Sequence, residues 1–95
     1  MPREETRDWL EKVREDLLTV FVLAEAGADT PGAICFHCQQ AVEKALKAVV
    51  IEQGRNPPRT HDLATLVRQI DQDSPQFPSE LRIQTYSLSV YAVDF

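Results

Sequence analysis

Apolar residues recur every three or four positions over residues 4–25, which is typical of a helix with one buried face. The expected buried face comprises Trp9, Val13, Leu17, Phe21 and Ala24, widened by Leu10 and Val20. Gly27 follows this stretch, and glycine is the residue best suited to end a helix. The pattern therefore predicts a first long helix that begins near Glu4 and ends near Glu25.

A second helix is predicted from Pro31 to about Gln53, with Thr30 as its N-cap, because proline is favourable in the first turn of a helix. Gly54 is expected to end it, and the two prolines among residues 55–59 cannot continue it. The expected buried face comprises Ile34, Cys38, Ala41, Val42, Ala45, Leu46 and Val49.

Two shorter helices are expected after this break. Thr60 or Asp62 caps the first of them, whose apolar stripe is Leu63, Leu66, Val67 and Ile70. Residues 71–78 are rich in turn-forming residues and predict a loop. A fourth helix over residues 79–95 places Leu81, Thr85, Leu88, Ala92 and Phe95 on one side.

The fold class predicted from these elements is an all-α, antiparallel bundle of four helices, with residues 1–95 as a single domain. The fourth helix reaches residue 95 without a capping residue, so we expect the natural chain to continue beyond this residue.

Composition and charge narrow the possible functions. The chain contains 43% hydrophobic and 26% charged residues, as globular domains do. It has no apolar run near the roughly 18 residues of a membrane span and no signal-peptide core, so we expect a cytoplasmic location. The net charge of -5 argues against a general nucleic-acid binder held by bulk electrostatics. Residues 31–70 contain five Lys or Arg against three Asp or Glu, so a phosphate site is expected there.

Four polar residues of the second helix form the first candidate site. At about 100° per residue, His37, Gln40, Lys44 and Lys47 fall within roughly a quarter-turn of one another. They would offer two cations, an amide and an imidazole to one ligand. The alternative is a solvated helix flank in which Glu43 and Lys47 form a pair at i, i+4 spacing.

The opening of the third helix is the second candidate. Its free backbone N–H groups and the positive end of its dipole could bind an anion together with Arg55 and Arg59, which stand just before it. The alternative is a simple N-cap with His61 packed on a neighbouring helix.

We predict no cofactor and no metal site in this chain. Cys35, His37 and Cys38 point in different directions on one helix, which does not suit a shared metal ion. Both cysteines are therefore expected to be reduced, and one or both to be buried.

The ordered motifs of the chain resemble the HEPN family over essentially its whole length. They are Trp9-Leu10 with Asp16-Leu17, the segment 36–48, Thr60-His61-Asp62-Leu63 and the segment 91–95. The resemblance implies a bundle of four or five helices, often a homodimer, that binds a nucleotide or RNA and serves a minimal nucleotidyltransferase partner. It also implies that the part of the natural chain beyond residue 95 includes a C-terminal helix. In this hypothesis the ligand-binding residues are His37, Gln40, Lys44, Lys47, Arg59 and His61.

Two alternatives follow from the same resemblance. Some branches are metal-independent ribonuclease toxins of toxin–antitoxin pairs, with an Arg followed four to six residues later by a His. Arg55 and His61 are the pair at that spacing, but they lie in a predicted loop instead of a late helix. We therefore assign no catalytic residue and keep Arg55 and His61 as the alternative pair. The other alternative is a non-catalytic dimerisation or interaction domain, with Trp9, Phe21, Phe77, Tyr86 and Tyr91 supplying its contacts.

Overall fold

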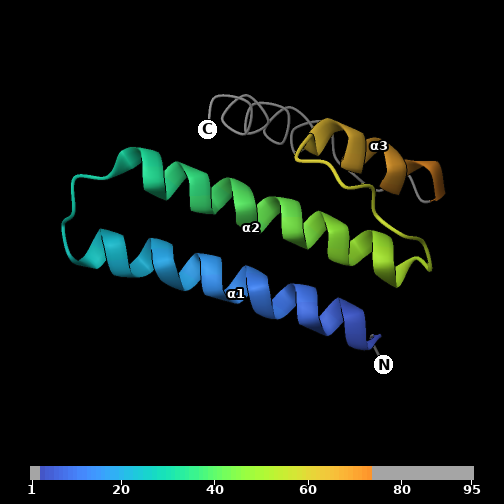
Figure 1. Cartoon of the computed structure of the whole chain (residues 1–95), viewed down its shortest axis with the longest axis horizontal. Coiled ribbons are helices and arrows are strands. Elements are labelled where there is room, and N and C mark those ends of the chain that lie inside the picture. The colour runs from blue at the N-terminus through green and yellow to red at the C-terminus, as the bar shows by residue number, and fades with distance from the viewer. Residues whose placement is uncertain (1–2, 74–95) are drawn as a thin grey trace.

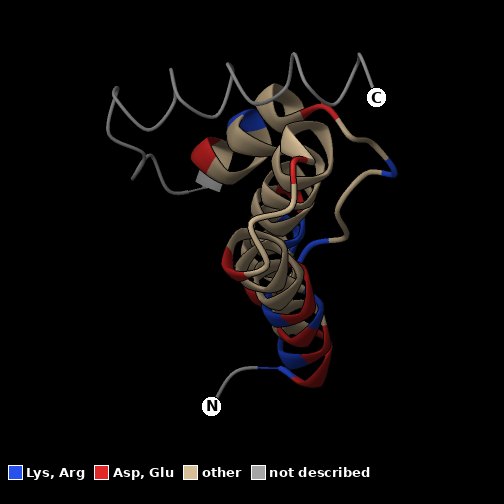
Figure 2. Cartoon of the chain, turned by 90° about the vertical axis from the view of Figure 1, so that its left-hand side faces the viewer, with Lys and Arg blue, Asp and Glu red and all other residues tan. Residues whose placement is uncertain are grey.

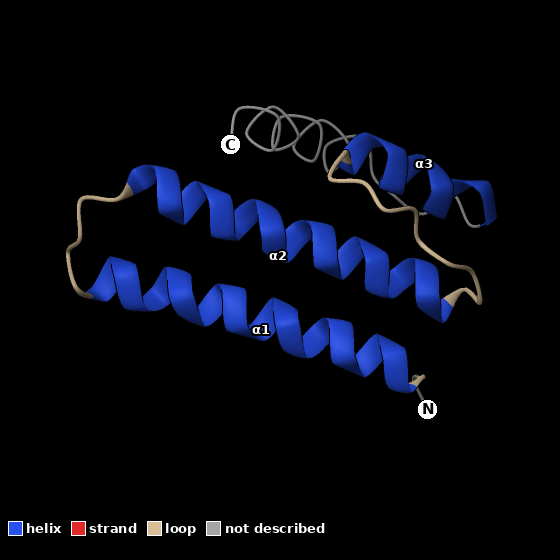
Figure 3. Cartoon of the chain, in the orientation of Figure 1, coloured by secondary structure: helices blue, strands red, loops and turns tan. Residues whose placement is uncertain are grey.

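The computed structural model describes residues 3–73, which form three α-helices and no strand (Figures 1 and 3). They are α1 (Glu4–Glu25), α2 (Pro31–Glu52) and α3 (Leu63–Asp73). The first two match the predicted helices. The predicted loop is wrong at its start, because residues 71–73 continue α3. The predicted fourth helix lies outside the described residues. None of the described helices is long and apolar enough to cross a membrane.

The first two helices lie antiparallel along their whole length (Figure 1). Gly27 allows the reversal between them, because its φ of 63° is in the left-handed region that side chains disfavour. Thr30 takes the predicted N-cap position of α2, although its side chain makes no capping hydrogen bond. At the other end of the pair, Thr6 Oγ1 donates to Glu52 Oε2 over 2.6 Å. The antiparallel arrangement predicted from the sequence is confirmed for this pair.

The third helix runs in the same direction as α2, not against it. His61, just before α3, contacts Glu43 in the middle of α2, and Gln53 after α2 donates to the carbonyl of Ile70 near the end of α3. The prediction of an antiparallel bundle is therefore wrong for α3. The cause is the connection over residues 53–62, which returns along α2 before α3 begins (Figure 1). This return places the connection over the middle of α2.

Apolar side chains join α3 to α2. The buried cluster comprises Leu46, Val50, Leu63, Leu66, Val67 and Ile70. All four residues of the predicted α3 stripe belong to it, and three of them are fully buried. Burying a side chain of this size stabilises a fold by roughly 1.5–3 kcal/mol. This cluster therefore fixes the position of α3 and of the connection that precedes it.

The buried face of α1 differs from the predicted one. The positions that face α2 are Thr6, Trp9, Val13, Asp16, Val20 and Leu23, all at spacings of three or four. The predicted core residues Leu10, Leu17, Phe21 and Ala24 are exposed, Phe21 by 65%. The prediction failed because two core positions are occupied by polar residues, which tolerate burial here since both are hydrogen-bonded.

The buried face of α2 is wider than predicted, because α2 lies between the other two helices. Ala41 and Leu46 are buried as predicted, but Val49 is exposed. Gln39, Glu43 and Lys47 are buried instead, at positions four residues apart. Cys35 and Cys38 are free thiols, and both are half-buried.

Candidate functional site

Two carboxylates organise the polar residues of α2. The first is Asp16 of α1, whose Oδ2 accepts from Lys44 Nζ over 2.6 Å and whose Oδ1 lies 2.9 Å from His37 Nδ1. We call these three residues the Asp16 cluster. A carboxylate can only accept, so Nδ1 of His37 carries the proton of that contact. The cluster connects α1 to α2 near their midpoints.

Two opposing effects set the pKa of Asp16. Burial by itself raises the pKa of this carboxyl, because it disfavours the charged form. The hydrogen bonds from Lys44 and His37, together with the positive charges of these groups, outweigh burial and hold the pKa of Asp16 below its usual value. Asp16 is therefore an ionised, buried group whose charge is matched by its neighbours.

The second carboxylate is Glu43 of α2, and its partners come from two segments. Its Oε2 accepts from Lys47 Nζ over 3.1 Å, and its Oε1 accepts from Gln39 Nε2 over 3.2 Å. Oε1 also lies 2.8 Å from Nδ1 of His61, which belongs to the returning connection. We call Gln39, Glu43, Lys47 and His61 the Glu43 cluster. Gln40 joins it at the edge, donating to Gln39 Oε1 over 3.0 Å.

His61 is oriented by this contact and still faces solvent. Its side chain is 74% exposed, whereas that of Glu43 is 4% exposed. Since Nδ1 points to the carboxylate, Nε2 is left available to a ligand. A buried carboxylate that fixes one ring nitrogen of an accessible imidazole is the arrangement that prepares histidine for ligand binding or proton transfer.

A hollow of about 350 Å³ opens beside the Glu43 cluster, between α1, α2 and the connection. It is lined by Trp9, Lys47, Ile51, Asn56, Pro57, Pro58 and Arg59. Lys47 belongs to both features, because its Nζ pairs with Glu43 and also lies 5.6 Å from the centre of the Trp9 ring. The volume is at the lower end of the range for small-ligand sites, so the hollow has room for one small ligand.

Arg59 supplies the accessible positive charge of this hollow. The side chain is exposed, and within residues 3–73 its guanidinium forms no hydrogen bond or ion pair. Lys12 lies over the same aromatic ring, with Nζ 4.8 Å from the centre of the Trp9 ring. Lys47 and Arg59 therefore line the hollow with Trp9, and Lys12 and Lys47 lie over the Trp9 ring.

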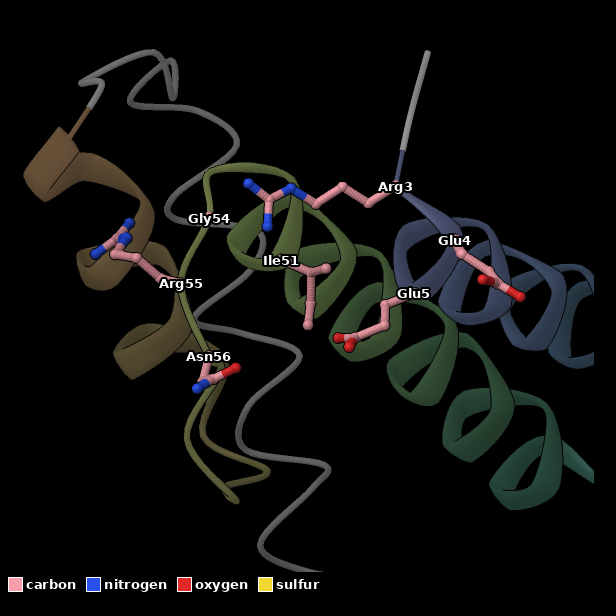
Figure 4. A pocket seen from close by; sticks show the side chains of 7 residues that line it. All are labelled: Arg3, Glu4, Glu5, Ile51, Gly54, Arg55 and Asn56. Carbon is pink, nitrogen blue, oxygen red and sulfur yellow. The ribbon is translucent and has the colours of Figure 1, made fainter.

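A neighbouring hollow of about 310 Å³ has a different character (Figure 4). Glu4 and Glu5 of α1 line it opposite Arg3 and Arg55, so its charges are mixed. Figure 4 shows the side chain of Arg3 reaching from the start of α1 toward Gly54. The backbone N–H of Arg3 donates a hydrogen bond to Glu52 Oε2. This hollow marks the place where the ends of α1 and α2 are tied together, and its two carboxylates disfavour an anion.

Arg55, the first member of the alternative catalytic pair, has a structural contact. Its Nη2 donates to the backbone carbonyl of Gln69 in α3 and to Gln53 Oε1. Figure 4 shows its side chain directed at α3. His61, the second member, is bound to Glu43 on α2. The contacts described thus attach Arg55 and His61 to different helices.

The predicted binding residues are therefore divided into two groups. Lys47 and His61 share Glu43, with Gln40 at the edge of that cluster, and Arg59 lines the hollow beside Lys47. His37 and Lys44 belong to the Asp16 cluster. The i, i+4 pair of Glu43 and Lys47, which the sequence analysis gave as the alternative to a ligand site, is present, but it is buried and not solvated. The sequence analysis missed Asp16 as the partner of His37 and Lys44, and Trp9 as the aromatic neighbour of Lys47.

Outside the two clusters and the hollow, positive and negative side chains lie close together along the surface of α1. Figure 2 shows Lys/Arg and Asp/Glu interleaved along α1, at the bottom of the view. One such pair joins Arg14 to Glu11, 3.1 Å apart and mostly exposed, and exposed pairs of this kind add little stability. Within the described part of the chain, no group of three or more His, Cys, Asp or Glu residues could hold a metal ion.

Comparison with known proteins identifies the family to which this chain belongs. The family model of the HEPN domain matches residues 6–94. No curated protein and no solved structure matches the chain. The match covers nearly the whole sequence, including all but the first two residues of α1, the Glu43 cluster and α3. This chain is a member of the HEPN domain family, a family of nucleotide- and RNA-related helical modules.

Proposed function

We propose that this chain binds the phosphate group of a nucleotide or of RNA at the hollow beside the Glu43 cluster. The main support is that Lys47 of α2 lines the hollow together with Arg59 of the returning connection and also shares the buried Glu43 carboxylate with His61. Charge-assisted hydrogen bonds to phosphate are stronger than neutral ones, and arginine matches phosphate geometry with two parallel N–H groups. Arg59 would bind the phosphate directly, with His61 Nε2 and Lys47 beside it.

The net charge of -5 limits the kind of binding expected. Attraction to a long polyanion through many contacts needs a broad basic surface, and α1 presents acidic groups instead. Binding should therefore depend on the local geometry of the hollow. A mononucleotide, or one nucleotide of a single strand, is the ligand that this geometry favours.

Calorimetric titration with AMP and with inorganic phosphate tests the proposal. We expect saturable binding to the unaltered chain and about tenfold weaker binding by Arg59→Gln, which loses one charge-assisted contact. Arg14→Gln is the matched control, because it removes the same charge from an exposed position on α1 outside the hollow. If both variants weaken binding equally, only the total charge matters and the proposed site is wrong.

The orientation of His61 favours a second candidate function, a metal-independent ribonuclease of a toxin–antitoxin pair. An imidazole held by Glu43 with Nε2 exposed can act as a general acid–base. Cleavage of RNA without added metal, lost in His61→Ala, would support this candidate. Cleavage that persists in His61→Ala would exclude His61 as the acid–base group.

The exposed apolar side of α1 supports the proposal of a homodimer. Large apolar side chains at this surface are Leu10, Leu17, Leu18, Phe21 and Val22. Contiguous exposed apolar residues mark interaction surfaces in soluble proteins. We expect Phe21→Glu to convert a dimer into a monomer in sedimentation equilibrium. A chain that is monomeric at all concentrations would contradict this proposal.

The family resemblance also supports a minimal nucleotidyltransferase as the protein partner. In that arrangement the hollow would hold the nucleotide that the partner uses. The test is co-purification with such an enzyme encoded beside this chain, compared between the unaltered chain and Arg59→Gln. Failure of both chains to associate with that enzyme would exclude the partnership.

A further inference from the structure

Trp9 has a property that the proposed phosphate site does not require. It is half-buried at a position of α1 that faces α2, and its ring lines the hollow instead of being enclosed in the core. Pro57 and Pro58 line the same hollow from the connection, and the buried Ile51 lines it from α2. The hollow therefore combines an aromatic ring and apolar walls with the cationic groups of Arg59 and Lys47.

We propose that the hollow is a nucleobase subsite, in which the base of a nucleotide stacks on Trp9 while its phosphate is bound by Arg59 and Lys47. This inference rests on the proposed function and identifies the ligand as a nucleoside monophosphate or a single nucleotide of an RNA strand. Aromatic rings bind bases without strong sequence preference, because every base has a flat π-face. The apolar walls exclude water from the faces and edges of the base.

The cations around the Trp9 ring are compatible with such a ligand. Lys12 Nζ lies 4.8 Å from the ring centre and Lys47 Nζ lies 5.6 Å from it. An exposed cation–π contact is weaker than stacking of a base on the same ring, so a base displaces Lys12 from the ring face. The displaced ammonium then remains close enough to contribute to the field on the phosphate, which carries close to two negative charges at neutral pH.

Asn56 is placed to contact the edge of the base. It is exposed, and it lines both this hollow and the neighbouring one at Arg3. Figure 4 shows its side-chain amide on the connection immediately after Arg55. An asparagine amide can donate and accept at once, as the edge of adenine does. Asn56 is therefore the residue that would determine any preference among bases.

The chain provides its own probe for this proposal, because Trp9 is its one tryptophan. Fluorescence excited selectively at tryptophan is followed during titration with AMP and, separately, with ribose 5-phosphate, which has the phosphate but no base. We expect AMP to quench the fluorescence saturably. Ribose 5-phosphate should bind by calorimetry and compete with AMP, yet leave the emission intensity nearly unchanged.

Substitution of the ring gives a second readout. Trp9→Leu should weaken AMP about tenfold, as the loss of one base–aromatic stack does, and should leave ribose 5-phosphate within about twofold of the unaltered chain. Trp9→Phe keeps an aromatic ring and should retain most of the affinity for AMP, which guards against a general effect of the leucine variant on folding.

The outcomes separate the two proposals. If AMP and ribose 5-phosphate bind equally, with no quenching and no effect of Trp9→Leu, the phosphate site stands and the base subsite is overturned. If neither ligand binds the unaltered chain, the proposed function fails and the base subsite fails with it. If AMP quenches the fluorescence of the unaltered chain, and Arg59→Gln needs more AMP for the same quenching, both proposals are supported.

Discussion

The Asp16 cluster and the Glu43 cluster contain the same three chemical groups, one carboxylate, one lysine and one histidine, but differ in access to solvent. Asp16, Lys44 and His37 lie between α1 and α2, and the His37 side chain is 30% exposed. In the Glu43 cluster the His61 side chain is 74% exposed and Lys47 borders the hollow at Trp9. The same three groups are therefore largely enclosed in one cluster and open to solvent at the histidine of the other.

The difference arises from the segments that supply the histidines. His37 belongs to a long helix that is fixed by its neighbours on both sides. His61 belongs to the connection that returns along α2, and it is positioned by Glu43 at one ring nitrogen. Binding residues are commonly found on segments of this kind, held by a rigid scaffold. We infer that the Asp16 cluster stabilises the helix pair, whereas the Glu43 cluster prepares a site.

Glu43→Gln should have the largest effect, because it changes a buried carboxylate with three partners. Removing one member of a buried ion pair typically costs about 3 kcal/mol or more. We expect urea denaturation to show a loss of that size, together with loss of measurable AMP binding. Glu11→Gln is the control, because its exposed pair with Arg14 contributes at most about 1 kcal/mol. Equal stability of the two variants would contradict the structural role of Glu43.

Asp16→Asn should separate stability from binding. The amide cannot match the charges of Lys44 and His37, so we expect a loss of about 2 kcal/mol in the free energy of unfolding. AMP binding should remain within about twofold, since Asp16 is outside the hollow. A variant that keeps its stability but loses AMP would reverse the roles assigned to the two clusters.

The lowered pKa of Asp16 predicts how stability depends on pH. Between the folded and unfolded pKa values the unfolded chain binds more protons, so the free energy of unfolding falls as pH falls. The contribution of Asp16 is complete above the unfolded pKa of about 3.9 and is lost below it, as pH falls through the lowered folded pKa.

Denaturation measured from neutral pH to below this range should therefore show a shallower loss for Asp16→Asn than for the unaltered chain. Glu52, whose pKa is lowered by its hydrogen bonds from Thr6 and the backbone of Arg3, supplies a slope of the same sign that both proteins retain. Identical slopes in the two proteins would contradict the role of Asp16.

Substitution of the two histidines should produce the smallest effects. One substitution should mainly lower stability, and the other should mainly weaken AMP binding. His37→Ala removes a hydrogen bond between helices and should cost about 1 kcal/mol in stability without altering AMP binding. His61→Ala should change stability by less than about 0.5 kcal/mol, because the side chain is exposed, yet weaken AMP severalfold. If His61→Ala changes neither quantity, its contact with Glu43 has no functional role.

The sequence predicted the parts of the fold that depend on local periodicity. The bounds of α1 and α2 and the apolar stripe of α3 follow from spacing, from Pro31 and from the glycines that end the helices. The buried face of α1 could not be predicted, because Thr6 and Asp16 are buried only by virtue of partners far along the chain, at Glu52, His37 and Lys44.

The candidate site was predicted in its residue types but not in its grouping. His37, Lys44, Lys47 and His61 were all identified, yet their division between two carboxylates depends on the direction of α3. That direction is set by the returning connection and by the packing of Leu63 and its neighbours on α2, which local spacing does not encode. Trp9 was assigned to the core for the same reason.

The two histidine rings allow the most direct test of the central claim, since the chain contains no others. Their ring proton signals are followed by NMR during titration with AMP, with His37→Ala used to assign them. The account predicts that the signals of His61 shift saturably while those of His37 remain in place. Movement of the His37 signals with those of His61 unchanged, or no movement of either, would contradict the claim that the Glu43 cluster is the binding site.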